Sequence, residues 1–122
     1  MQFDTLTQAL EEILEHIARI EQFVANVDER QFQNDARTVF AVHYAVSVIS
    51  AVAVRLGDWA EVLSPDVPWH RLRDLGTQLR PGYDRIDPSV LWNTVVDDLA
   101  PLQLSTMRAL NQLEDHERLE WL

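Results

Sequence analysis

Apolar and polar positions follow a helical period at the start of the chain. Apolar side chains recur at intervals of three and four residues from Leu6 to Val24, and the charged side chains between them fall mainly on the other side. Thr5 and Gln8 have the spacing of a capping box, which marks a helix start. The pattern predicts a helix over residues 5–25 that packs on one side only.

A longer apolar segment follows a polar connection at residues 26–35, in which Phe32 is a candidate anchor. Asp35 is a suitable N-cap and Gly57 a suitable C-terminal glycine, so a helix is predicted over residues 36–56. Apolar residues lie almost all round this helix, and a helix of that kind is surrounded by protein. We therefore expect it to form the core or to lie at a subunit interface, rather than to span a membrane.

Prolines divide the second half of the chain. A short helical turn is predicted over residues 59–63, and a longer helix from about Trp69 to Arg80, because Pro81 cannot continue it. Asp87 and Pro88 have the order of an N-cap and a first helical position, so another helix is expected there.

Pro101 is expected to end or kink that helix, and helical spacing continues through Leu113 to the end of the chain. Because no stretch alternates as strands do, the sequence predicts a single all-α domain over residues 1–122. Its expected architecture is an up-and-down bundle of four to five helices.

Composition limits the classes of function. The net charge is −10, all ten basic residues are arginine, and cysteine is absent. A surplus of carboxylates repels the phosphate backbone of nucleic acids. Binding of RNA or DNA is therefore disfavoured but not excluded. The absence of cysteine excludes disulfides and thiolate chemistry, and the N-terminus does not have the form of a signal peptide. A cytoplasmic protein is expected.

No cofactor or metal site is expected from local motifs. His16, His43, His70 and His116 fall in different predicted helices and have no ligand spacing. Asp97 and Asp98 are adjacent, so on a helix they point about 100° apart and are expected on a solvated face.

Three tryptophans, Trp59, Trp69 and Trp92, are expected to be packing anchors, and Trp121 to be exposed or at a subunit contact.

Three stretches within residues 20–102 read "IEQFVANVDERQF", "AVRLG" and "DVPWHRLRDLGTQLRPGYDRIDPSVLWNTVVDDLAPL". In these stretches the chain resembles the HepT-like branch of the HEPN proteins. The resemblance implies an all-helical bundle of the HEPN type and a homodimer. Many of its members are ribonuclease toxins encoded beside a minimal nucleotidyltransferase antitoxin.

The resemblance also implies where a catalytic motif would lie. The family motif reads Arg-Asn, any three residues, His, any residue, Tyr. Aligned without gaps from Pro68-Trp69, its first three positions are Gly76, Thr77 and Pro81 here, and its last is Tyr83. A family Gly-Glu-Ala stretch corresponds to residues 50–52, which read Ser-Ala-Val, so the glutamate position is occupied by alanine.

Two functions follow from this resemblance. The first is a degenerate HepT-like protein of a toxin–antitoxin-type system, which acts by binding, as a homodimer, with a nucleotidyltransferase partner. In it, Tyr83 is an AMP acceptor, a packing residue of a shared dimer cleft, or neither. The alternative is a metal-independent ribonuclease with a relocated site, built from Arg80, Tyr83 and His43 or His70. Arg73 and Arg80 are the candidate phosphate contacts.

Overall fold

The computed structural model describes residues 3–63, 65, 67–78 and 87–120. Within these ranges the chain forms seven α-helices and no strand. Their bounds are α1 (Phe3–Val24), α2 (Glu29–Gln33), α3 (Ala36–Leu56), α4 (Asp58–Leu63), α5 (Trp69–Gln78), α6 (Pro88–Asp97) and α7 (Leu99–Glu120). The predicted all-α class is confirmed.

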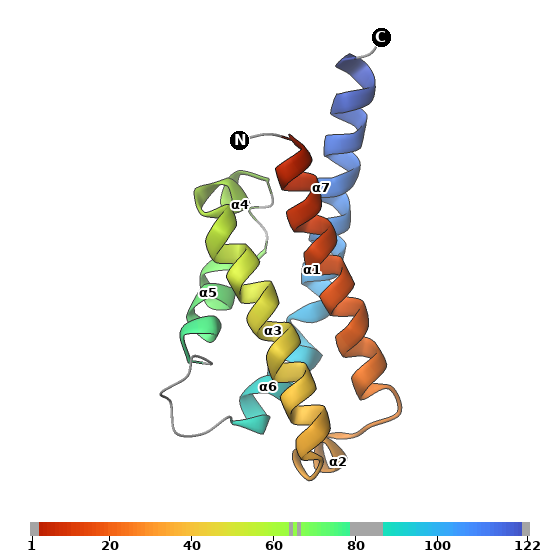
Figure 1. The fold of residues 1–122 in the computed structure, drawn as a ribbon, viewed down its shortest axis with the longest axis vertical. Coiled ribbons are helices and arrows are strands. Elements are labelled where there is room, and N and C mark those ends of the chain that lie inside the picture. The colour runs from red at the N-terminus through yellow and green to blue at the C-terminus, as the bar shows by residue number, and fades with distance from the viewer. Residues whose placement is uncertain (1–2, 64, 66, 79–86, 121–122) are drawn as a thin grey trace.

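The helices form an up-and-down bundle with α3 at its centre. In Figure 1, α1 and α3 run in opposite directions side by side, and α7 lies along the far side of α1. The shorter helices α5 and α6 pack on α3, and α2 contacts both α3 and α6 at one end of the bundle. This arrangement places α5, which carries part of the predicted motif, directly against the central helix.

The ends of α3 form as the sequence predicts. The Asp35 side chain accepts hydrogen bonds from the backbone N–H groups of Arg37 and Thr38, at 3.1 and 3.4 Å. A hydrogen bond from the Thr38 hydroxyl, together with these backbone bonds, lowers the pKa of Asp35. At the other end Gly57 has a φ of 57°, where a side chain is unfavourable.

Two local predictions are wrong. The polar connection contains a helix, α2, because Asp28 and Gln31 form a reciprocal capping box. Pro101 does not end a helix: α6 ends at Asp97, and Pro101 lies in the first turn of α7. A proline is tolerated there because the first N–H groups of a helix have no intrahelical partner.

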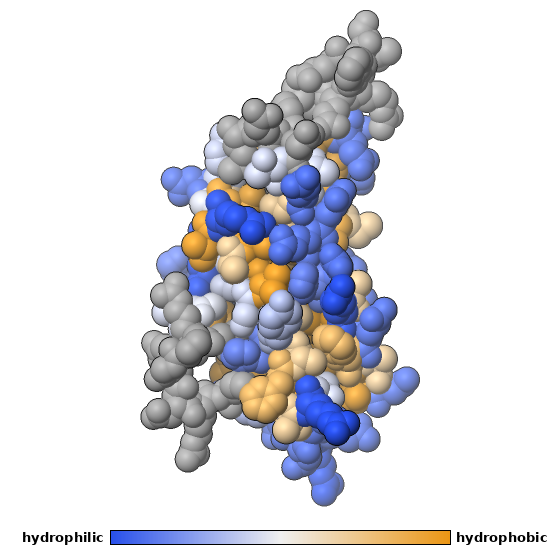
Figure 2. Space-filling model, in the orientation of Figure 1, coloured by the Kyte–Doolittle hydropathy of each residue, from blue (hydrophilic) through white to orange (hydrophobic). Residues whose placement is uncertain are grey.

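One side of α3 forms the core and the other is exposed. Nine of its residues are buried, among them Val42, Ile49 and Ala53. On the opposite side Phe40, Tyr44 and Val54 have relative exposures of 61%, 67% and 54%. Figure 2 shows apolar surface along the diagonal that α3 follows in Figure 1. The sequence predicts that protein surrounds α3 on all sides. Within this chain, neighbouring helices cover one side only.

The length and composition of α3 would also suffice for a membrane span. However, the core helix of a soluble bundle meets the same criteria. Half of its most apolar window is buried against neighbouring helices, and the other half is not.

The tryptophans differ in burial. Trp69 is 2% exposed, and Trp92 is half-buried with its ring centroid 5.3 Å from that of Phe32. Phe32 itself is fully buried, so its predicted role as an anchor is confirmed. Trp59 is 46% exposed on α4, so the prediction that it anchors the core is wrong. Trp121 lies outside the described residues.

Candidate functional site

Gly76, the first of the motif positions, lies in close contact with the central helix. A Cβ atom added at residue 76 would lie 1.8 Å from the hydroxyl oxygen and 2.7 Å from the Cβ of Ser50 on α3. Real Cβ contacts essentially never fall below 3.0 Å. Ser50 therefore occupies the space that the first atom of any side chain at residue 76 would need.

Thr77 follows on the exposed surface of α5. Its hydroxyl donates to the carbonyl oxygen of Arg73 one turn earlier, at 3.4 Å. The predicted site residues Arg80, Pro81 and Tyr83 lie outside the described residues. The predictions that concern them, including a role for Tyr83 as an AMP acceptor, stay predictions.

The contact between Gly76 and Ser50 gives a stability prediction. We expect Gly76→Ala to lower the free energy of unfolding by about 1–3 kcal/mol, because overpacking outweighs the better helix propensity of alanine. Adding Ser50→Gly should recover most of this loss. Adding Ser50→Ala should recover less, since the Cβ at 2.7 Å remains. Urea unfolding of these three variants, of the single variants Ser50→Gly and Ser50→Ala, and of the unmodified protein gives two double-mutant cycles that measure the coupling. Equal effects of Ser50→Gly and Ser50→Ala would contradict this account.

Arg73 connects three helices. Its guanidinium donates to the carbonyl oxygens of Ala53 and Gly57, at 3.1 and 2.7 Å, and pairs with both carboxylate oxygens of Glu61 on α4. The hydrogen bonds that Arg73 donates to Glu61 raise the pKa of Arg73 and lower the pKa of Glu61. With these partners the arginine holds α5 to α3 and α4. Its predicted contact with phosphate stays a prediction.

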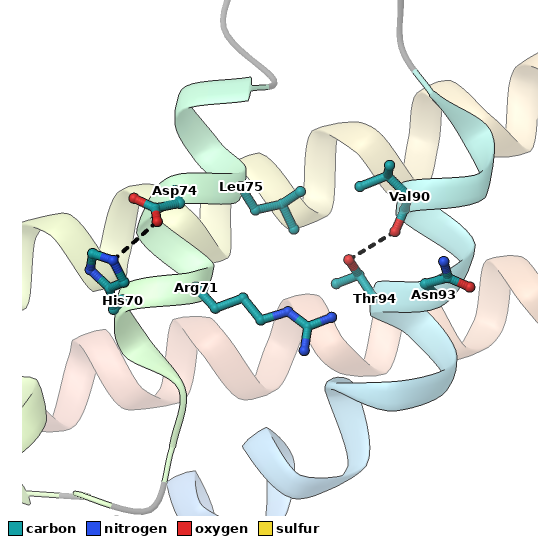
Figure 3. A pocket seen from close by; sticks show the side chains of 7 residues that line it. All are labelled: His70, Arg71, Asp74, Leu75, Val90, Asn93 and Thr94. Carbon is teal, nitrogen blue, oxygen red and sulfur yellow. Dashed lines mark hydrogen bonds and ion pairs between the residues drawn. The ribbon is translucent and has the colours of Figure 1, made fainter.

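A pocket of about 440 Å³ opens between α5 and α6. Arg71 extends from α5 toward α6, beside the paired side chains of His70 and Asp74 (Figure 3). Nε2 of His70 lies 3.2 Å from Oδ2 of Asp74, and both side chains are exposed. The pocket is lined by His70, Arg71, Asp74, Leu75, Val90, Asn93 and Thr94. It combines an imidazole, a guanidinium and an amide in one place.

Beside this pocket Arg71 pairs with a buried carboxylate. Its Nη1 lies 3.2 Å from Oδ1 of Asp98, which is 6% exposed. Oδ2 of Asp98 is buried with no hydrogen-bond partner in the described part of the chain. Burial raises the pKa of Asp98, and the charge of Arg71 opposes that rise. The prediction that Asp97 and Asp98 share a solvated face is therefore wrong for Asp98.

Sequence reasoning missed this ion pair because Asp98 ends α6 instead of continuing it. The break between α6 and α7 turns the side chain inward, which a continuous helical period does not predict. A signal was present in Pro101, since a proline in the first turn of a helix places the helix start shortly before it.

The buried pair gives a pH-dependent prediction. Arg71→Met should destabilise the protein by about 1–2 kcal/mol at pH 7, because it leaves the Asp98 charge buried without its cation. The pKa of Asp98 should then rise further. A raised folded-state pKa means that stability is lost as pH rises through that pKa, so the variant should be closest to the unmodified protein in acid. Unfolding at several pH values measures this.

The matched control is Arg19→Met, which removes an exposed pair with Glu15 on α1. It should change stability by less than about 0.5 kcal/mol at any pH. A deficit of Arg71→Met that does not depend on pH would contradict the role assigned to Asp98.

Other ionisable groups lie apart from this site. His43 is half-buried on α3, and neither a hydrogen bond nor an ion pair joins it to His70 in the described ranges. The ring of His16 bonds to the Glu12 carbonyl oxygen of its own helix, at 2.8 Å. Among the described residues no three metal-ligating side chains gather in one place. Among the described residues, the pocket and the contact at Gly76 are therefore the two features that we relate to function.

Comparison with known proteins identifies the family of the chain. Residues 13–109 match the model of a family described as ribonuclease HepT-like. A protein of Thermococcus cleftensis, described as probable ribonuclease HepT, is 32% identical over 94 residues, which are 77% of this chain and 86% of that protein. No solved structure matches significantly. The chain belongs to the HepT-like ribonuclease family.

Proposed function

We propose that this chain is a HepT-like protein that does not cleave RNA and acts by binding. It would function as a homodimer together with a minimal nucleotidyltransferase, in a system of the toxin–antitoxin type. The observation that carries this proposal is the contact between Gly76 and Ser50. It leaves no space for a side chain at the position where the family motif has arginine.

The chemistry of RNA cleavage explains why this loss matters. Attack by a 2′-hydroxyl without a metal needs a group that moves a proton and a cation that stabilises the developing negative charge. A positioned acid or base contributes about 10²–10⁴-fold, and a positioned donor contributes a similar factor. Gly76 and Pro81 stand at the motif positions that would supply these groups. Neither residue can do so.

The cations described on α5 do not replace the missing arginine in this proposal. Arg73 is bound by two carbonyl oxygens and Glu61, and Arg71 pairs with Asp98. The net charge of −10 also disfavours the approach of RNA. A protein partner is therefore the more consistent ligand.

A nuclease assay tests the proposal. Purified protein, free of any antitoxin, should leave single-stranded RNA and tRNA intact in the presence of a chelator, and its expression alone should not slow bacterial growth. The matched control is the same protein with Tyr83→Phe, which should behave identically. Metal-independent cleavage that disappears with a substitution near Tyr83 would overturn the proposal.

A second candidate function is a ribonuclease whose site has moved. The pocket between α5 and α6 favours it, because His70 and Arg71 both line it and offer a proton carrier and a cation. Cleavage by the unmodified protein that is lost with His70→Ala, but kept with His16→Ala, would support this function over the first.

A nucleotidyltransferase partner is tested separately. Co-expression with such an enzyme, followed by intact mass measurement, should give a complex, and AMP transfer to Tyr83 would add one AMP to the mass. An unshifted mass together with a stable complex would mean that Tyr83 has another role.

A further inference from the structure

The pocket between α5 and α6 is large enough to hold a small molecule. Its volume of about 440 Å³ falls within the range of about 300–1,000 Å³ that is usual for ligand pockets. Arg71, Asp74 and Leu75 line it from α5, and their spacing of three and four residues places them on one side of that helix. Gly76 contacts Ser50 of α3 on another side. The proposed function leaves this pocket unused.

Two apolar side chains form walls of the pocket. Leu75 from α5 and Val90 from α6 point toward one another (Figure 3). Leu75 is buried, whereas Val90 is 37% exposed, so part of this apolar surface is in contact with water. An apolar ring placed between them would remove that surface from water, which is favourable. The walls therefore favour a ligand with a flat apolar body.

Arg71 supplies hydrogen-bond donors to the same pocket. Its guanidinium extends from α5 toward α6, and the side chain is 60% exposed (Figure 3). Nη1 pairs with Oδ1 of Asp98, and within the described ranges Arg71 has no other partner. Every nitrogen of a guanidinium carries N–H donors, so several of them stay available to a ligand.

Asp98 fixes the position of this guanidinium before any ligand binds. The carboxylate is 6% exposed, and its Oδ2 has no hydrogen-bond partner in the described part of the chain. A buried charge of this kind depends on its one cation, so Arg71 cannot leave without a large cost. A binding group that is already in place does not lose conformational freedom when the ligand arrives.

Asn93 and Thr94 complete the polar part of the pocket from α6. Asn93 is exposed, and its amide makes no hydrogen bond within the described residues, so it offers both a donor and an acceptor. The hydroxyl of Thr94 donates to the Val90 carbonyl oxygen at 3.0 Å, which leaves it free to accept. Together with Arg71 these groups match a ligand that has both a carbonyl oxygen and an N–H group.

The charges around the pocket favour an uncharged ligand. One cation, Arg71, stands against the two carboxylates of Asp74 and Asp98, and Asp74 pairs only with the imidazole of His70. An anionic ligand would add a third negative charge, in a chain whose net charge is already −10. A cationic ligand would meet the guanidinium that lines the pocket.

We propose that the pocket between α5 and α6 binds an uncharged, planar small molecule that carries an amide. The amide bonds to Arg71 and Asn93, and the ring of the ligand lies between Leu75 and Val90. This inference goes beyond the proposed function and does not depend on it.

Titration followed by NMR tests the chemistry of the ligand. Benzamide, which combines a ring with a primary amide, is the probe, and benzoate is its charged counterpart of the same shape. Benzamide should shift the side-chain N–H signals of Asn93 and Arg71 in the unmodified protein. Benzoate should bind at least about tenfold more weakly. Tighter binding of benzoate, or no shift with benzamide at about 10 mM, would overturn the proposal.

Variants test the location of the site. Asn93→Ala should weaken benzamide binding about five- to tenfold, because it removes hydrogen bonds to the amide. Val90→Trp should abolish binding, because the larger side chain fills the pocket. Asn111→Ala, at an exposed asparagine of α7, is the matched control and should bind as the unmodified protein does. Circular dichroism verifies that the variants are folded. Unchanged binding by both Asn93→Ala and Val90→Trp would place benzamide elsewhere and refute the site.

Competition separates a small-molecule site from a nucleic-acid site. Single-stranded RNA should leave bound benzamide in place. Displacement of benzamide by RNA would overturn the proposal and assign the pocket to the alternative ribonuclease function. The failure of benzamide to bind would leave the expected lack of RNA cleavage unchanged, because the nuclease assay measures that independently.

Discussion

Phe32→Ala should lower the free energy of unfolding by about 3–5 kcal/mol, the largest stability loss expected among the substitutions considered. Phe32 is fully buried, although it belongs to the five-residue helix α2. Its ring lies against Trp92 of α6, with centroids 5.3 Å apart. Removing it would leave a cavity at the end of the bundle where α2 contacts α3 and α6. Chemical denaturation measures the loss.

Phe23→Ala is the matched control, because the same side chain is 40% exposed on α1. It should cost clearly less than Phe32→Ala. Trp92 fluorescence should also change in Phe32→Ala at low denaturant, since its ring neighbour is gone. Similar losses in the two variants would mean that α2 contributes little to the fold.

Restoring the family motif should produce the largest change in activity. The required substitutions are Ser50→Gly, Ala51→Glu, Gly76→Arg, Thr77→Asn and Pro81→His. The variant that carries all five substitutions regains a proton carrier and a cation. We therefore expect it to cleave RNA without metal at least about 10²-fold faster than the unmodified protein. A chelator-treated cleavage assay measures the rate.

The pair Gly76→Arg and Pro81→His alone should fall well short of that rate. An arginine at residue 76 would collide with Ser50, and residue 51 would still lack its carboxylate. The informative control therefore adds Ser50→Gly to the pair, which should improve both folding and cleavage. Strong cleavage by the pair alone would show that the contact at Ser50 does not exclude the motif.

Much of the fold could be predicted because its elements have local causes. The spacing of apolar residues in α1 and the capping residues Asp35, Gly57 and Asp87 can be recognised in short stretches of sequence. The helices α3 and α6 begin or end next to these capping residues. The helix α2 was not predicted, because its five residues lie in a polar segment and are too few to show a helical spacing of apolar residues. Its capping box is a local signal of a helix within an otherwise polar connection.

The site was less predictable because its features join distant segments. The contact of Gly76 with Ser50 and the pair of Arg71 with Asp98 join α3, α5 and the end of α6. A single sequence shows which residue types occur, but not which ones meet. The exposed side of α3 was likewise hidden, since valine and alanine occur on both its buried and its exposed sides.

The guanidinium of Arg73 has a consequence for local motion. It binds main-chain oxygens at the end of α3 and in the link to α4, as well as the Glu61 carboxylate. These segments cannot separate from α5 without breaking several bonds of one side chain at once. In amide hydrogen exchange this corner should open as one cooperative unit, while the first turns of α1 exchange independently.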